Sequence, residues 1–245
     1  MHASVDSSPF GPLQASPWVR PSARRGIDAV DHFARKARAI VASDTTRCRR
    51  LRELALMEDA LRRCFHGEAA TPAFATLRTA VRTYGLPHSA FQRLLAAARA
   101  EVVTKHYATF DRMIEACEGS AKPIGQLVLL VHGHREPALH RFSDALCTGL
   151  RLAVDLRDLE PQLERGRCVI PQEDLVHFQV ERDALSEVRH SAAVRELLAF
   201  QAARARSFLE RGAPLLRHVA PELRSPLAER VGRGLMTLDR LTRAR

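Results

Sequence analysis

The stretch Gly149–Phe178, GLRLAVDLRDLEPQLERGRCVIPQEDLVHF, decides how the rest of the chain folds. Its first half has apolar residues at helical spacing and carries polar side chains into that apolar setting. Pro161 removes one backbone hydrogen bond, so we expect the helix to kink or restart there. Pro171 predicts a short ordered connection, and the Glu173-Asp174 pair after it is typical of a helix N-terminus. Because several helices of the chain carry polar groups on inward faces, the helices must surround something.

Helical patterns continue through the rest of the sequence, with clear stop and start signals between them. Ser43–Thr46 can end one helix and cap the next, and Thr71-Pro72 opens another. Ser89 and Gln92 form a capping-box pattern that opens a long helix, whereas Gly119–Pro123 predicts a break. The predicted helices cover residues 27–41, 47–66, 72–84, 89–117, 124–131, 137–156, 192–211 and 226–241, the last capped by Ser225.

No segment alternates between apolar and polar residues as a half-buried strand does, so the fold class is all-α. We expect one helical domain over residues 26–245. Residues 1–25 hold several prolines and serines, which predicts an extended, partly disordered arm rather than a helix.

Composition sets further limits. The start of the chain lacks the pattern of a signal peptide and no apolar run reaches the ~20 residues of a membrane span, so the cytoplasm is the expected compartment. The 5 cysteines form no CxxC pair and are expected to be reduced core thiols. The net charge of +10 suits anionic partners, but basic residues are dispersed and aromatics make up only 5%, so we expect no nucleic-acid partner.

Several short motifs stand in a characteristic order and spacing along the chain. They are Tyr107–Phe110 followed by Cys117, Lys122–Gly125, Arg157-Asp158, Arg165–Arg167, Ile170–Leu175, and Phe200-Gln201 with Gly212–Leu215. Together they resemble the squalene/phytoene synthases, and PQEDL with the FQxARxR…GAPL segment is similar to the hydroxysqualene synthase branch of the hopanoid pathway. The resemblance extends from about Ser16 to Leu241.

The resemblance implies the isoprenoid synthase helical bundle around a central apolar cavity. That family joins two prenyl diphosphates head-to-head or ionises the cyclopropyl product of that joining. Two aspartate-rich helices face each other and bind Mg²⁺, because a diphosphate leaves only when hard cations neutralise its charge. Apolar walls then shelter the carbocation from water. The implied ligand is a prenyl diphosphate or a long-chain isoprenoid.

The first aspartate motif of the family is altered in this chain. The framework Phe33–Arg35 is present, but Arg38, Ala39 and Ala42 stand at the three aspartate positions. No carboxylate remains in this turn to bind a cation.

The second aspartate motif is altered as well. Arg151, Val154, Asp158 and Gln162 lie on one helical face where the family has Gln, Asn, Asp and Asp, so Asp158 alone survives. Asp155 is either a substitute ligand or the i, i+4 partner of Arg151, and we favour the pair. Magnesium is therefore expected for the family but doubtful here, and we assign no metal ligand.

Two interpretations of the altered site stay open. Arginines can hold a diphosphate directly, since guanidinium pairs with phosphate in a bidentate way. Alternatively Arg38 forms a salt bridge with Asp158 across the former metal site, which we favour. The candidate residues are Asp158 as a weak catalytic candidate, and Arg35, Arg38, Tyr107, Arg151, Arg157 and Arg167 for substrate binding.

Two functions follow from this pattern. The first is a protein of squalene or hopanoid biosynthesis that binds a prenyl diphosphate or its products, with the metal-dependent reaction in doubt. The second is a non-catalytic scaffold or lipid-binding partner of an intact paralogous synthase. Since the family's substrates are lipid-like, peripheral contact with the inner membrane is also considered.

Overall fold

The computed structural model describes residues 21–68, 71–187 and 191–243 of the chain, and all regular elements in these ranges are helical. The helices are α1 (Pro21–Ala42), α2 (Arg47–Phe65), α3 (Pro72–Tyr84), α4 (His88–Val103), α5 (Phe110–Val131), α6 (Pro137–Arg157), α7 (Leu159–Glu164), α8 (Gln172–His177), α9 (Ala192–Gly212), α10 (Leu215–His218) and α11 (Pro221–Arg243), with a 3₁₀ turn η2 at Asp183–Ser186.

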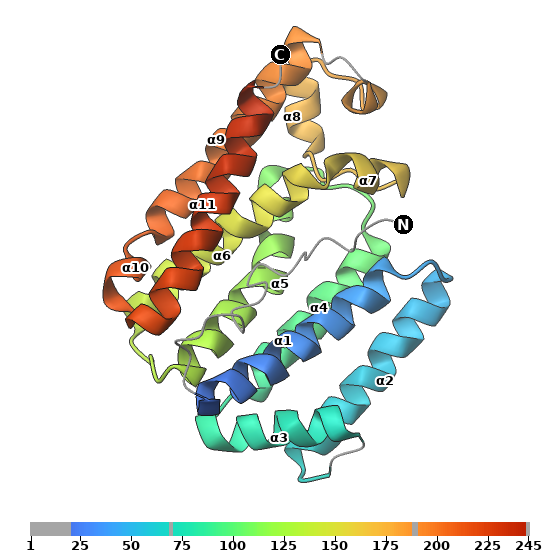
Figure 1. Ribbon diagram of the computed structural model, residues 1–245. Coiled ribbons are helices and arrows are strands. Elements are labelled where there is room, and N and C mark those ends of the chain that lie inside the picture. Colours follow the sequence, from blue (N-terminus) through green and yellow to red (C-terminus); the bar gives the residue numbers. More distant parts are fainter. Residues whose placement is uncertain (1–20, 69–70, 188–190, 244–245) are drawn as a thin grey trace.

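Helix α6 is the centre of the bundle (Figure 1). It packs against α5 on one side and against α9 and α11 on the other, while α4 and then α1 extend the bundle beyond α5. Two glycines allow α6 and α9 to lie very close together. A Cβ added to Gly212 would lie 2.5 Å from the backbone nitrogen of Leu146, and one added to Gly149 would lie 2.8 Å from that of Leu209.

The stop and start signals of the sequence are largely confirmed. Thr46 and Thr71 cap α2 and α3 by accepting backbone N–H hydrogen bonds, and Gly85 ends α3 in the left-handed conformation. The helix that contains Gly149 begins at Pro137, as predicted. The break predicted at Pro161 is also present, because α6 ends at Arg157 and α7 starts again at Leu159.

The prediction of one helix over residues 89–117 is wrong. Helix α4 ends at Val103 and α5 begins at Phe110, and the segment between them is not helical. Its backbone groups bind a distant segment instead of continuing a helix: Lys105 and Tyr107 carbonyls accept from the Cys168 and Gln172 amides at 2.8 and 2.9 Å. The apolar stripe continues across the gap although the helix does not.

Three further boundaries differ from the sequence prediction. The Ser89–Gln92 capping box is not formed, because α4 starts one residue earlier with Pro87 at the N-cap position. The predicted break at Gly119–Pro123 lies inside α5, where almost every side chain from Ala121 to Val131 is buried and this packing keeps the helix continuous. Pro226 lies inside α11, which begins at Pro221 because two later amides already bind the Ala220 carbonyl.

The expected N-terminal arm is shorter than predicted where the structure describes it. Helix α1 begins at Pro21, so residues 21–25 are helical, and residues 1–20 lie outside the described ranges. None of the helices in the described ranges is long and apolar enough to cross a membrane.

Candidate functional site

A small internal space lies where α1, α4, α5 and α6 meet. Its polar lining consists of Arg38, Glu101, Ser120 and Arg151, and the rest is apolar. Arg38 comes from the first altered motif and Arg151 from the second, so the two motif helices do meet at this space. Its volume is about 30 Å³, which holds two or three waters at roughly 10–15 Å³ each.

Glu101 of α4 binds two of the arginines predicted to hold the substrate. Its Oε1 accepts from Arg151 Nη2 at 3.3 Å and also from Arg167 Nη1. Arg167 is brought there because the connection after α7 pairs with the segment that follows α4. The three side chains are at most 20% exposed, so this is an interior ion-pair network rather than a surface one.

The network keeps its charges at neutral pH. Burial opposes ionisation of Glu101, but the neighbouring Arg151 and Arg167 outweigh it and lower the pKa of this carboxyl to about 2. Burial likewise opposes the charge on Arg151, yet Asp155 and Glu101 raise the pKa of its guanidinium further above the usual value. Glu101 and Arg151 are therefore both ionised, because the opposite charges of their partners stabilise the ionised form of each.

Asp155 extends the network along α6. Its Oδ2 accepts from Arg151 Nε at 2.8 Å, which confirms the predicted i, i+4 pair. The Cys117 thiol donates to the same oxygen at 3.8 Å, and burial together with Asp155 raises the pKa of that thiol. Asp155 is consequently engaged as a structural carboxylate.

Tyr107 completes the network. Arg167 Nη2 donates to its hydroxyl oxygen at 3.3 Å, and burial raises the pKa of the phenol, which stays protonated at neutral pH. Four of the predicted binding residues are thus brought together around Glu101: Arg38, Tyr107, Arg151 and Arg167.

The other predicted site residues lie elsewhere. Both carboxylate oxygens of Asp158 accept from Arg157, at 2.8 and 3.0 Å, so the predicted Arg38–Asp158 salt bridge is wrong. The reason is local: α6 ends at Arg157, and Asp158 sits in the break before α7 with its side chain 31% exposed. Arg35 pairs with Asp31 at 2.7 Å on α1 and is 55% exposed.

The donor set at this site does not fit the magnesium ions of the resemblance. Among the described residues, the carboxylate that lines the space is Glu101, and Arg151 binds both it and the neighbouring Asp155. Mg²⁺ prefers oxygen ligands in octahedral geometry, whereas the side chains that line the space between the motif helices include two guanidinium groups. Within the described ranges, no group of three His, Cys, Asp or Glu side chains is placed to hold a metal ion.

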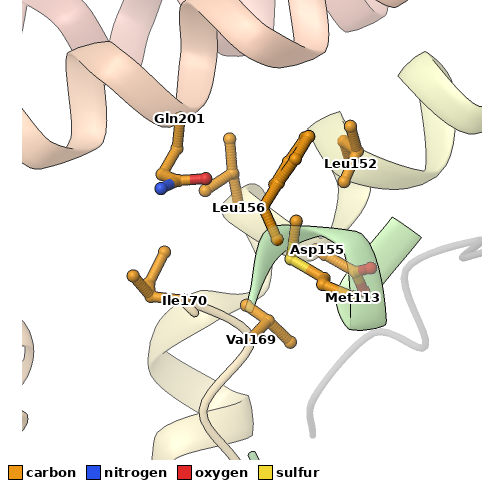
Figure 2. Close-up of a pocket in the computed structure, with 8 residues that line it drawn as sticks. Met113, Leu152, Asp155, Leu156, Val169, Ile170 and Gln201 are labelled. Atoms are coloured by element: carbon orange, nitrogen blue, oxygen red, sulfur yellow. The ribbon is translucent and has the colours of Figure 1, made fainter. Parts of the chain in front are cut away.

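A second internal space lies on the other side of Asp155 (Figure 2). Its volume is about 10 Å³, the size of a single water. Its walls come from α5, α6, α9 and the connection before α8, and they are apolar apart from two side chains. The lining residues are Phe110, Met113, Leu152, Asp155, Leu156, Val169, Ile170 and Gln201.

Glu101 is the site residue that sequence reasoning missed. It follows Leu94 and Ala98 at i+7 and i+3, so helical spacing places it on the buried stripe of α4. A carboxylate on a buried stripe needs a partner, and that requirement is the signal that could have found it.

The fold and the site define a class. The bundle superposes on the crystal structure of squalene synthase HpnC from Alicyclobacillus acidocaldarius with a TM-score of 0.87 and 31% identity, over 94% of this chain and 86% of that one. It also matches a dehydrosqualene synthase crystallised with a ligand, with a TM-score of 0.83 and 20% identity, over 92% of this chain and 79% of that one, which shows the fold alone. The class is therefore the isoprenoid synthase helical bundle.

Sequence comparison narrows the class to a family. Residues 13–245 match the squalene/phytoene synthase family, and the chain belongs to it. The hydroxysqualene synthase of Sinorhizobium fredii is 34% identical over 62% of this chain and 53% of its own length, and that of Zymomonas mobilis is 30% identical over 80% and 66%. The chain thus lies near the hydroxysqualene synthase branch, and spans between half and two thirds of these relatives' lengths.

Proposed function

We propose that this chain acts in squalene or hopanoid biosynthesis by binding a prenyl diphosphate or its isoprenoid product, without carrying out the metal-dependent ionisation of the diphosphate. As a squalene/phytoene synthase-like protein it belongs to isoprenoid biosynthesis. The observation that carries the proposal is the Glu101–Arg151–Asp155 network, in which two carboxylates hold an arginine of α6 beside the space that Arg38 also lines.

The chemistry of this network suits binding better than ionisation. A departing diphosphate has to be neutralised by cations that carry several positive charges at one point. Here the positive charge of Arg151 is already balanced by two carboxylates, whose salt bridges span 3.3 and 2.8 Å. Arg38 and Arg151 face the space between the helices, and guanidinium groups bind phosphate oxygens with good geometry.

A titration with farnesyl diphosphate tests the proposal. We expect binding to the purified protein that is equally tight with Mg²⁺ and with a chelator, and no release of diphosphate in either condition. Magnesium-dependent release of diphosphate at a rate typical of enzymes would contradict the proposal. Farnesyl diphosphate and presqualene diphosphate should both be tried, because the family uses both.

A second function is favoured by the size of the internal spaces. About 30 and 10 Å³ are far below the roughly 300–1,000 Å³ of small-molecule sites. A bundle filled with side chains suits a non-catalytic scaffold that associates with an intact paralogous synthase. Co-purification of the two proteins, together with no binding of any prenyl diphosphate, would favour the scaffold over the ligand-binding protein.

A further inference from the structure

Two apolar side chains are exposed on α8 and α9, the two helices that the Asp174–Arg204 ion pair joins. Val176 is 67% exposed at the end of α8, and Phe200 of α9 is 36% exposed. Phe178, two residues after Val176, packs its ring against that of Phe200 with 5.3 Å between centroids. The contacting rings of Phe178 and Phe200 thus give the junction of α8 and α9 an apolar outer side.

Arg204 of α9 contacts the ring of Phe200 and joins α9 to α8. Its guanidinium carbon lies 4.0 Å from the ring centroid of Phe110 and 4.1 Å from that of Phe200, so it is held between two rings. Its Nη1 donates to Oδ2 of the buried Asp174 at 2.5 Å. The Gln201 amide donates to the same oxygen at 2.7 Å, so one carboxylate fastens α8 to α9.

Two neighbours of this ion pair form part of the wall of the second internal space. Phe110 contacts Arg204 and also lines that space, and so does Gln201, which binds Asp174. Figure 2 shows Gln201 facing the apolar side chains of Leu156 and Ile170 across the space. Arg204 therefore lies between Phe110, which lines the internal space, and the partly exposed ring of Phe200.

The lining of the interior selects the chemistry of a ligand. Asp155 and Gln201 are its polar side chains, and each already has a partner, Arg151 for the first and Asp174 for the second. A ligand there finds mostly Leu, Ile, Val and Met walls and no unsatisfied polar group that calls for a hydrogen bond. An isoprenoid hydrocarbon chain meets these conditions.

We propose that the Asp174–Arg204 ion pair is the closed latch of an access route between α8 and α9 through which an isoprenoid chain reaches the interior. The start of α8 is anchored, because its Gln172 and Glu173 amides bind the Tyr107 and Ala108 carbonyls at 2.9 and 3.1 Å. Opening therefore swings the Val176 end of α8 away from α9. In the latched state the interior is the size of a single water. Because only open molecules bind the ligand, the measured affinity is the intrinsic affinity multiplied by the fraction of open molecules.

This inference rests on the proposed function for its ligand class. Uncharged farnesol is the probe, because its binding tests the access route separately from the binding of a diphosphate. We compare the unaltered protein with the double variant Arg204→Met, Asp174→Asn, which keeps side-chain size but removes both charges. The matched control is Arg206→Met, Asp239→Asn. It removes an ion pair that joins α9 to α11 instead of to α8. We expect farnesol to bind one per chain, about tenfold more tightly to the latch variant than to the control or the unaltered protein.

A second measurement covers the case in which the latch variant fails to fold. In the unaltered protein, amide hydrogen exchange across residues 174–180 should accelerate when farnesol is bound. Equal affinity of a folded latch variant and the control, unchanged exchange in the farnesol complex, or no farnesol binding to any of these proteins overturns the access route. None of these outcomes bears on farnesyl diphosphate, whose binding tests the proposed function, because farnesol has no diphosphate to contact Arg38 or Arg151.

Discussion

Arg151 Nη2 of α6 donates to Glu101 Oε1 of α4 at 3.3 Å, and this contact ties together two helices whose contributing residues are 50 positions apart in the sequence. The resemblance implies an uncharged glutamine at position 151, whereas Arg151 carries a positive charge that Glu101 balances. The ion-pair network around Glu101 thus ties α4 to α6 and to the connection that carries Arg167.

Glu101 should be a strong determinant of stability. The variant Glu101→Gln leaves Arg151 and Arg167 without the carboxylate that balances them, and breaking one partner of such an interior pair costs roughly 3 kcal/mol. Urea unfolding of both proteins at pH 7 measures the difference. The control is Glu115→Gln, which breaks a pair whose side chains are 64% and 70% exposed and should cost under about 1 kcal/mol. Equal losses in the two variants would contradict this role.

The stability conferred by Glu101 should depend on pH in a defined direction. Arg151 and Arg167 outweigh the opposing effect of burial and lower the pKa of Glu101 from 4.5 to about 2. A lowered folded-state pKa gives stability that is complete above the unfolded pKa of 4.5 and is lost as the pH falls towards 2. The difference in unfolding free energy between the unaltered protein and Glu101→Gln should therefore shrink by about 3 kcal/mol across that window.

The contacts that sequence reasoning could predict are local ones. The Arg151–Asp155 pair follows from i, i+4 spacing on one helix and is confirmed at 2.8 Å. Glu101 was missed because its partners lie 50 and 66 residues away, and only the packing of α4 on the later segments brings them together. The Arg38–Asp158 pair was wrong because it assumed that α6 continues through Asp158, where the chain in fact breaks.

The fold itself was predictable for a related reason. Caps such as Thr46 and Thr71 act within a few residues, so their pattern gives helix boundaries directly. The continuous course of α5 through Pro123 could not be read in this way, since burial against other helices outweighs the missing hydrogen bond. Local sequence therefore predicts the helices, while tertiary packing decides which of the predicted helix breaks are present in the fold.

Close packing of α6 on α9 gives a prediction about Gly212. The variant Gly212→Ala places a Cβ 2.5 Å from the Leu146 backbone nitrogen, which cannot move without shifting α6. We expect a loss of about 1–3 kcal/mol in unfolding free energy, since overpacking forces backbone shifts. Gly232→Ala is the control, because no atom lies within 4 Å of the added Cβ and alanine favours the α11 helix by about 0.5–1 kcal/mol. In thermal unfolding we expect Gly212→Ala to lower the melting temperature and Gly232→Ala to raise it.

Arg38 should hold the diphosphate of a bound prenyl diphosphate, since it lines the space between the motif helices with Arg151. We expect Arg38→Ala to weaken farnesyl diphosphate binding roughly tenfold or more, because a hydrogen bond to a charged group contributes about 1.5–3 kcal/mol. Arg38→Lys should recover only part of the affinity, since an ammonium group cannot bind phosphate in a bidentate way. Farnesol affinity should be the same in all of these proteins, because it lacks the group that Arg38 contacts.

The matched control for Arg38 is Arg35→Ala on the same helix. Arg35 is 55% exposed, pairs with Asp31 and does not line the space that contains Arg38. Its removal lowers the net charge of the protein by the same amount, so any general electrostatic attraction of the ligand falls equally in both variants. If Arg35→Ala weakens farnesyl diphosphate binding as much as Arg38→Ala does, the diphosphate is attracted by overall charge rather than by a site between α1 and α6. A loss confined to Arg38→Ala that persists with chelator present places the diphosphate at that site without a metal ion.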